Sequence, residues 1–140
     1  MVCPYCSCDT SVVNSRLQRR SNQVWRRRQC KACRAVFTTL EAVDLPTTII
    51  VDSRGHSEPF LPDKLYTEVL LALQDRKDAY VAAREVTNTV IKELLKLPDK
   101  PLFRPEQISR AAGGVLKRLD RRAYLRYAAE HPSLKLPRRL

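Results

Sequence analysis

The sequence has few of the features that mark membrane proteins or secreted proteins. No stretch of its 140 residues approaches the roughly 18 to 20 consecutive apolar residues that a membrane span needs. The chain begins with a cysteine pair instead of a charged segment followed by an apolar one. We therefore expect a soluble, intracellular protein that has no membrane partner.

Patterns typical of enzymes are also scarce. The phosphate-binding loop G-x-x-x-x-G-K-[ST] does not occur, and the whole chain has only three glycines. Its two histidines, His56 and His131, lie far in sequence from any candidate nucleophile. A histidine in a turn is usually only solvated, so we expect a protein that is not an enzyme.

Positive charge, in contrast, is abundant and unevenly distributed. The net charge is +11, and the middle of the chain, residues 46–116, is balanced between basic and acidic side chains. The excess lies in residues 1–45, with 8 basic against 3 acidic residues, and in residues 117–140, with 8 against 2. This distribution indicates contact with a polyanion at one or both ends, with a solvated tail as the alternative at the C-terminal end.

Four of the five cysteines form two C-x-x-C pairs: Cys3, Cys6, Cys30 and Cys33. Such pairs suit one tetrahedral zinc ion, and four protein ligands leave no position open for a substrate, so the metal would be structural. In so polar a segment, metal binding would supply the folding free energy, on the order of 10 to 16 kcal/mol. A disulfide framework does not fit the odd cysteine count, and a thioredoxin-type pair belongs beside a βαβ unit that is not present here. Cys8 is left without an assigned role.

The residues between the two cysteine pairs are rich in arginine. Alternation on a small β structure would place Arg26 and Arg28 on one face and Arg27 on the other. Some of this charge compensates the four thiolates, but the formal +5 of the segment falls only to about +3 once four thiolates and Zn²⁺ are counted. The excess favours nucleic acid. The candidate DNA-binding residues are Arg16, Arg19, Arg20, Arg26, Arg27 and Arg28.

A change in composition near residues 44–46 predicts two domains, 1–45 and 46–140. In the second, a β-branched run at 47–51 and a segment at 58–60 predict two short strands joined by a turn at Gly55, with Pro59 at an edge. Helices are predicted over 62–74, 78–97, from 105 onward and over 121–129. The first two carry apolar residues at helical spacing: Leu65, Val69, Leu70 and Leu73 in the first, and Ala83, Val86, Val90, Leu94 and Leu97 in the second. The third would bury Ile108, Ala112, Val115 and Leu119, and its internal Gly113 and Gly114 imply close packing or a break. The last would bury Tyr124, Leu125 and Ala128. The expected class is α+β.

Several stretches of the sequence resemble those of a known family. CPYC, the triplet NSR at 14–16 and RRRQCKACRAVFTTLE ending at Glu41 are similar to the zinc ribbon of the bacterial NrdR repressors, which regulate ribonucleotide reductase genes. The rest of the chain resembles that family's ATP-cone domain, in which a β hairpin leads into a helical bundle that binds ATP or dATP. The matching residues are Ile50, Val51, Gly55, Glu58, Pro59, Phe60, Lys64, Leu65, Ala72, Leu119, Asp120, Ala123, Tyr124 and Arg126.

The resemblance implies a small zinc ribbon that binds operator DNA, followed by a mainly helical ATP-cone domain that senses adenine nucleotides and controls self-association. It also implies a bacterial cytoplasmic protein, associated with the nucleoid when bound. The implied nucleotide-binding residues are Ile50, Val51, Arg54, Glu58 and Lys64.

The sequence also departs from the family's pattern. Family cones have lysine and arginine where this chain has Asp52 and Ser53, and family ribbons usually have arginine where this chain has Val36. An aspartate beside a triphosphate is repulsive unless a metal intervenes. The alternative is therefore a nucleic-acid-binding adaptor whose degenerate cone no longer binds nucleotide.

Overall fold

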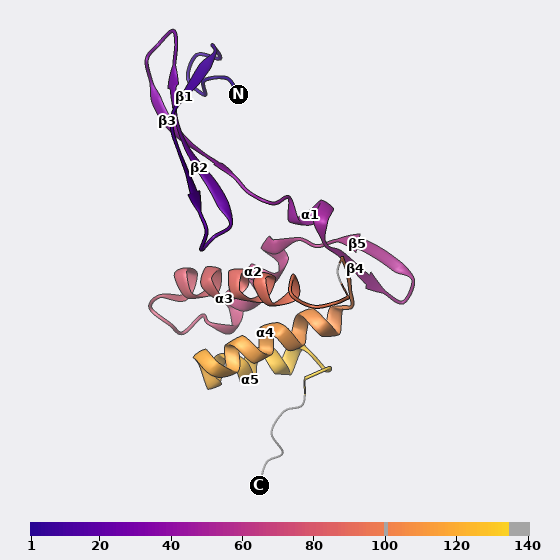
Figure 1. The fold of residues 1–140 in the computed structure, drawn as a ribbon. Coiled ribbons are helices and arrows are strands. Elements are labelled where there is room, and N and C mark those ends of the chain that lie inside the picture. Colours follow the sequence, from indigo (N-terminus) through magenta and orange to yellow (C-terminus); the bar gives the residue numbers. More distant parts are fainter. Residues whose placement is uncertain (100, 135–140) are drawn as a thin grey trace. The chain divides into compact units, whose positions relative to one another are not determined.

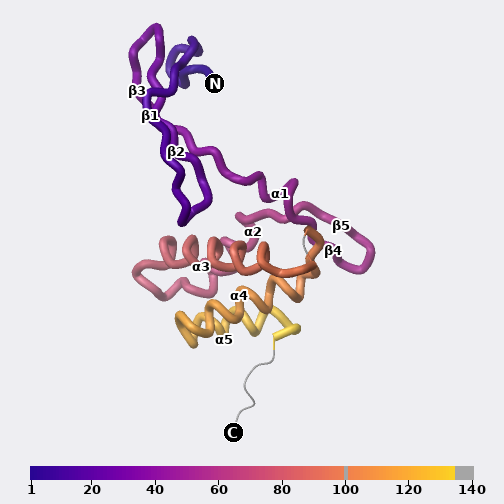
Figure 2. Tube along the Cα trace, in the orientation of Figure 1, coloured from indigo at the N-terminus to yellow at the C-terminus, as the bar shows by residue number. Residues whose placement is uncertain are grey.

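The computed structural model describes residues 1–99 and 101–134, and the chain divides into two compact units, Met1–Asp44 and Leu45–Leu140 (Figures 1 and 2). The class is α+β, a β-rich ribbon followed by a mainly helical region with a small sheet, which confirms the expected class. No helix within the described part of the chain is long and apolar enough to cross a membrane. Residues 135–140, which carry part of the basic C-terminal excess, lie outside the described residues.

The first unit is a three-stranded antiparallel sheet in the order β1-β2-β3. Its strands are β1 (Thr10–Gln18), β2 (Gln23–Cys30) and β3 (Val36–Glu41). A bulge between Val12 and Asn14 shifts the register of β1. Among residues 1–44 the only buried hydrophobic side chains are Cys3 and Cys30, which are 1% and 0% exposed. The sheet therefore has no apolar core, and the cysteines occupy its interior.

The second unit opens with a helical turn, α1 (Leu45–Thr48), and a mixed sheet in the order β5-β4-β6. The strands are β4 (Ile50–Ser53), β5 (His56–Pro59) and β6 (Leu102–Phe103), with β4 and β6 parallel. Arg54 and Gly55 have φ of 53° and 84°, as the two central residues of a tight type I′ hairpin turn require.

The predicted hairpin is present, and Pro59 lies on the edge strand as expected, but two details of the prediction were wrong. Residues 47 and 48 belong to the helical turn α1, so the strand begins at Ile50 instead of residue 47. The second strand comprises His56–Pro59 instead of 58–60. Strand β6 was not predicted at all, because a pairing of two residues depends on a chain segment that returns from about fifty positions away.

Four helices follow in the order predicted: α2 (Pro62–Ala72), α3 (Ala79–Leu94), α4 (Pro105–Leu119) and α5 (Arg121–Glu130). They pack together, and the β4–β5 hairpin lies at one end of the bundle they form (Figure 1). α2 and α3 end two and three residues earlier than predicted. In α3 the last turn continues only to Leu97, whose N–H donates to the carbonyl oxygen of Leu94 (2.9 Å), before Pro98.

The core of this unit is a single apolar cluster that joins the sheet to all four helices. Ile49, Val69, Leu73, Leu94 and Phe103 are completely buried in it. The periodicity therefore identified the buried faces of α2 and α3, whose predicted residues lie in or against this cluster.

Two predicted core positions were wrong. Leu119 is 44% exposed and Leu125 is 36% exposed. In α5 the buried residues are instead Ala123, Tyr127 and Ala128. Which stripe of α5 is buried depends on its packing against α2 and α4, and the periodicity of this short segment does not fix it.

α4 is continuous through its two glycines, and close packing explains one of them. A Cβ placed on Gly113 would lie 3.0 Å from Cδ1 of Leu134 and 3.5 Å from Cε2 of Tyr124. Gly114 has more space, with Arg118 Nη1 at 3.9 Å as its nearest neighbour. Of the two alternatives, close packing and a break, the structure shows packing at Gly113 and no break.

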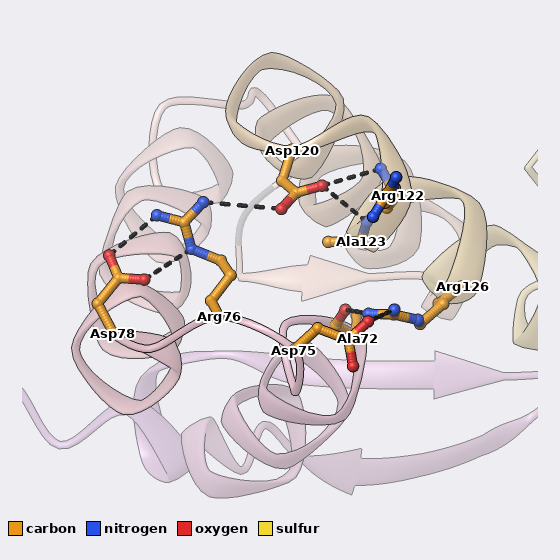
Figure 3. Close-up of polar contacts among 8 residues, drawn as sticks. All are labelled: Ala72, Asp75, Arg76, Asp78, Asp120, Arg122, Ala123 and Arg126. Atoms are coloured by element: carbon orange, nitrogen blue, oxygen red, sulfur yellow. Dashed lines mark hydrogen bonds and ion pairs between the residues drawn. The ribbon is translucent and has the colours of Figure 1, made fainter.

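A polar network joins the ends of these helices (Figure 3). The carboxylate of Asp120 caps α5 by accepting from the N–H groups of Arg122 (2.9 Å) and Ala123 (3.1 Å). These backbone hydrogen bonds, chiefly that of Ala123, lower the pKa of Asp120. Arg76 lies between Asp120 and Asp78, 3.6 Å and 2.8 Å from their respective carboxylates. The network ties the segment after α2 to the start of α5.

A second contact ties the same two helices together further along. Arg126 on α5 donates to the carbonyl oxygen of Ala72 (3.0 Å), which ends α2, and pairs with Asp75 (Figure 3). Since that carbonyl group lies in the last turn of α2, a guanidinium group there replaces a backbone donor that the helix itself cannot supply.

Candidate metal centre and nucleic-acid interface

The two C-x-x-C pairs form matching turns. In the first, the N–H of Ser7 donates to the carbonyl oxygen of Cys3 (2.9 Å), and Ser7 has a φ of 59°. In the second, Arg34 occupies the equivalent position, directly after the second cysteine, with a φ of 62°. The left-handed backbone after each pair curls the chain so that both thiols of the pair point to one side.

The four cysteine sulfurs converge. All four Sγ atoms lie within 4.8 Å of one another, with Cys3 and Cys33 separated by 3.7 Å and Cys6 and Cys30 by 3.5 Å. Four sulfurs placed tetrahedrally at ~2.3 Å from zinc would be ~3.8 Å apart, so the donor set fits that ion. The N–H of Cys33 points at Cys30 Sγ (3.4 Å). These four cysteines are positioned to bind one zinc ion.

The fifth cysteine is not part of this cluster. Cys8 is exposed, and its thiol donates to the carbonyl oxygen of Cys6 (3.5 Å). Hydrogen bonding from the backbone of Cys8, and then from the thiol of Cys30, lowers the pKa of Cys6 to about 6. Cys8 therefore contributes its backbone to the metal centre, and its side chain is not one of the four converging sulfurs.

The strand pairing separates the arginines of β2 into two faces, as alternation predicts. Arg26 pairs with Thr39 of β3, and Arg27 pairs with Thr38. Because directly opposed residues of antiparallel strands share a face, Arg26 and Arg28 lie on one side of the sheet and Arg27 on the other. The predicted alternation is confirmed.

The face of Arg26 and Arg28 is occupied by internal polar contacts. Arg26 pairs with Glu41 at 2.7 Å and is 34% exposed. The Nε of Arg28 donates to the hydroxyl oxygen of Thr39 (3.2 Å). Both side chains are half-buried, so this face holds its guanidinium groups in fixed positions.

The opposite face is more open. Arg27 is exposed and donates from Nη1 to the hydroxyl oxygen of Thr38 (3.2 Å). Arg16 pairs with the half-buried Trp25 on this same face and is itself exposed. Arg19 and Arg20 are exposed in the turn that joins β1 to β2.

The structure gathers only part of the predicted nucleotide-binding set. Val51, Glu58 and Lys64 line one cavity of about 190 Å³, and Lys64 pairs with Glu58 there at 3.4 Å. Ile50 is not among the residues that line it. Arg54 lines a separate hollow of about 330 Å³.

The first cavity combines apolar walls with polar groups. Its apolar lining includes Phe60, Leu65 and Ile108, and Ser109 and His131 add polar atoms. The last three come from α4 and from the residue after α5, distant in sequence from the hairpin. No motif signals that they face the hairpin, so sequence reasoning missed them.

A comparison with protein families gives a match at the N-terminal end. Residues 1–41 match the model of the N-terminal domain of NrdR-like transcriptional repressors. The first unit is therefore similar to an NrdR-like zinc ribbon, which confirms the ribbon part of the resemblance. The matched family is one of transcriptional regulators and not of enzymes, in agreement at the family level with the expectation of a non-enzyme. The helical unit lies outside the matched residues.

Proposed function

We propose that this protein is a zinc-ribbon transcriptional repressor of ribonucleotide reductase genes, acting on double-stranded operator DNA in the bacterial cytoplasm. The observation that carries the proposal is a sheet joined to four converging cysteine sulfurs, with arginines on both of its faces and at its hairpin turn. A sheet with so little apolar interior and so much exposed positive charge is suited to a phosphate backbone.

The open face of the ribbon is the better candidate for phosphate contacts. Arg16, Arg27 and Arg19 are exposed, and none of them belongs to an ion pair formed within residues 1–99 and 101–134. Arg26, in contrast, is neutralised by Glu41 at 2.7 Å. We expect the exposed arginines to supply salt-dependent affinity, and the fixed Arg26 and Arg28 to contribute less to it.

Salt titration of DNA binding tests this. The zinc-loaded protein is titrated onto DNA duplexes that include the region upstream of ribonucleotide reductase genes, at several salt concentrations. Arg27→Gln should flatten the slope of log K against log[salt] by about 0.9 for the phosphate contact it removes. Arg84→Gln, an equal charge change on an exposed residue of α3, is the matched control and should leave the slope unchanged. Equal slopes for Arg27→Gln and the parent protein, with the ribbon folded, would contradict the proposed DNA face.

Regulation by adenine nucleotides and self-association belong to the same proposal. One ribbon offers a small footprint, below the ~600 to 1,000 Å² typical of single DNA-binding modules, so two or more ribbons presented together would be needed. The cavity that Val51, Glu58 and Lys64 line supports a site for the adenine base. A nucleotide with unequal affinity for two assemblies would shift the balance between them.

The cavity also limits how a nucleotide binds. Its volume of about 190 Å³ is below the roughly 300 Å³ at which ligand pockets begin, so it would enclose the base and leave the phosphates outside. Binding heat and solution mass, measured together during titration with ATP and dATP, test this regulation. The same mass with either nucleotide and with none would remove nucleotide-controlled assembly from the proposal.

A second candidate is a nucleic-acid-binding adaptor whose cone is only a scaffold. Asp52 and Ser53 favour it, because they place no positive charge directly after β4. It predicts DNA binding by the ribbon with neither heat nor a thermal shift on addition of any adenine nucleotide.

A further inference from the structure

A second hollow lies beside the base cavity, at the carboxyl ends of two parallel strands. Its volume is about 330 Å³, and it is lined by Asp52, Ser53, Arg54, Arg104, Pro105 and Glu106. Val51 of β4 pairs with Phe103 of β6. Asp52 of β4 and Arg104, which directly follows β6, therefore lie at neighbouring positions, although they are 52 positions apart in sequence.

Within residues 1–99 and 101–134, no acidic side chain forms an ion pair with the arginines around this hollow. Arg54, Arg104 and the nearby Arg110 are exposed, and none of them lies within 4.0 Å of a carboxylate oxygen in the described part of the chain. The carboxylate of Asp52 instead accepts from the hydroxyl of Ser57 (3.2 Å). Asp52 and Glu106 line the same hollow but form no ion pair with these arginines. The N–H groups of the guanidinium side chains therefore remain available to donate to a ligand.

Gln107 fixes the position of Arg104. Its side-chain oxygen accepts from the N–H of Arg104 (2.8 Å), and its Nε2 donates to Asp99 (2.7 Å). The first contact holds the backbone of Arg104 at the start of α4, and the second engages the carboxylate of Asp99, which lines the adjoining surface with Arg104. The guanidinium group thus projects from a fixed backbone.

We infer that Arg54 and Arg104 bind the polyphosphate chain of the adenine nucleotide whose base occupies the neighbouring cavity. This inference rests on the proposed nucleotide binding and adds its phosphate site. Pro105 lines both hollows, and Val51 of the base cavity directly precedes Asp52 of the second, so one ligand would extend from one hollow into the other. Two guanidinium groups, one from the hairpin turn and one from the residue between β6 and α4, thereby take the place of positive charge that β4 itself does not provide at Asp52 and Ser53.

Because of the two acids in the hollow, we expect the phosphate chain to bind more tightly together with a divalent cation. Asp52 and Glu106 offset the formal charge of Arg54 and Arg104, so a free triphosphate meets repulsion as well as attraction. A magnesium complex of the same phosphate chain carries less negative charge and suits a balanced site better. Binding should therefore strengthen with Mg²⁺, and Asp52→Asn should weaken this dependence.

Calorimetry with three probes tests the site in the full-length, zinc-loaded protein. The probes are adenosine, ATP with Mg²⁺ and inorganic tripolyphosphate with Mg²⁺. Arg104→Gln should weaken binding of the two phosphate probes by about tenfold or more and leave adenosine binding unchanged, since a charge-assisted hydrogen bond is lost. Arg118→Gln, at the other end of α4, is the matched control for a change in net charge and should affect none of the three.

The three probes separate the two proposals. Adenosine binding with unchanged ATP and tripolyphosphate affinity in Arg104→Gln would overturn the phosphate site and leave the base cavity standing. Tripolyphosphate binding that depends on Arg104, without any adenosine binding, would support the anion site and remove the base cavity from the proposed function. No binding of either phosphate probe to the parent protein would overturn the phosphate site.

Discussion

Removing the zinc should unfold the ribbon and leave the helical unit folded. The two units are separately compact, and in residues 1–44 the only buried hydrophobic side chains are Cys3 and Cys30. Both are metal ligands by geometry. The interior of the ribbon is thus its metal site, whereas the helical unit has an apolar cluster of its own.

The magnitudes decide the outcome. Burying even a large apolar side chain such as Leu or Phe completely contributes only about 1.5 to 3 kcal/mol, and each of the two buried cysteines, which is smaller, contributes less. A structural zinc site contributes on the order of 10 to 16 kcal/mol. The metal therefore contributes more to the folding free energy of the ribbon than apolar burial does. Without the metal, the three-stranded sheet should unfold.

The chain supplies a separate reporter for each unit. Trp25 is the only tryptophan and lies half-buried in β2 of the ribbon. The four long helices all belong to the second unit, so helical circular dichroism at 222 nm reports on that unit. On addition of a chelator, or with Cys6→Ser, the emission of Trp25 should shift to the red. The helical signal and its cooperative thermal transition should remain.

Cys8→Ser is the matched control, because the Cys8 thiol is not among the four converging sulfurs. This variant should keep one zinc per chain and an unshifted Trp25 emission. Parallel loss of the helical signal and the Trp25 signal on chelation would refute the independence of the two units. An unchanged Trp25 emission in zinc-free protein would refute the argument that the metal holds the ribbon together.

Two further predictions concern the stability of the helical unit. Asp120→Ala should lower its unfolding free energy by about 1 kcal/mol, because the cap on the N–H of Ala123 is lost. The pKa of Asp120 is lowered in the fold, so its contribution is complete above the unfolded value of about 3.9 and is lost as the pH falls through the lower folded value. Denaturation at pH 7 and at pH 2 should show this difference between the variant and the parent shrinking in acid, and an equal difference at both pH values would contradict it. Gly114→Ala should raise thermal stability by up to about 1 kcal/mol, and Gly113→Ala should gain less, because its Cβ would meet Leu134 at 3.0 Å. An equal gain at both positions in a melting experiment would contradict the packing argument.

The sequence predicted a feature of this protein correctly where that feature depends only on residues close together in the chain. The spacing of Cys3, Cys6, Cys30 and Cys33 is a local feature of two turns, and the structure brings these sulfurs within 4.8 Å of one another. The turn at Gly55 and the buried faces of α2 and α3 likewise follow from neighbours in sequence. Errors arose at Leu119 and Leu125, where the face that is buried depends on how α4 and α5 pack.

The sequence by itself determined the ribbon, its metal ligands, the alternation of Arg26, Arg27 and Arg28, and the order of the helices, because each depends on spacing over a few residues. Only the tertiary structure decided that β6 returns beside β4, which places Arg104 next to Asp52. Such a juxtaposition depends on the packing of segments about fifty residues apart, for which no local periodicity exists. The positive charge that β4 lacks is therefore supplied by Arg104, which directly follows β6, and only the folded chain brings it beside β4.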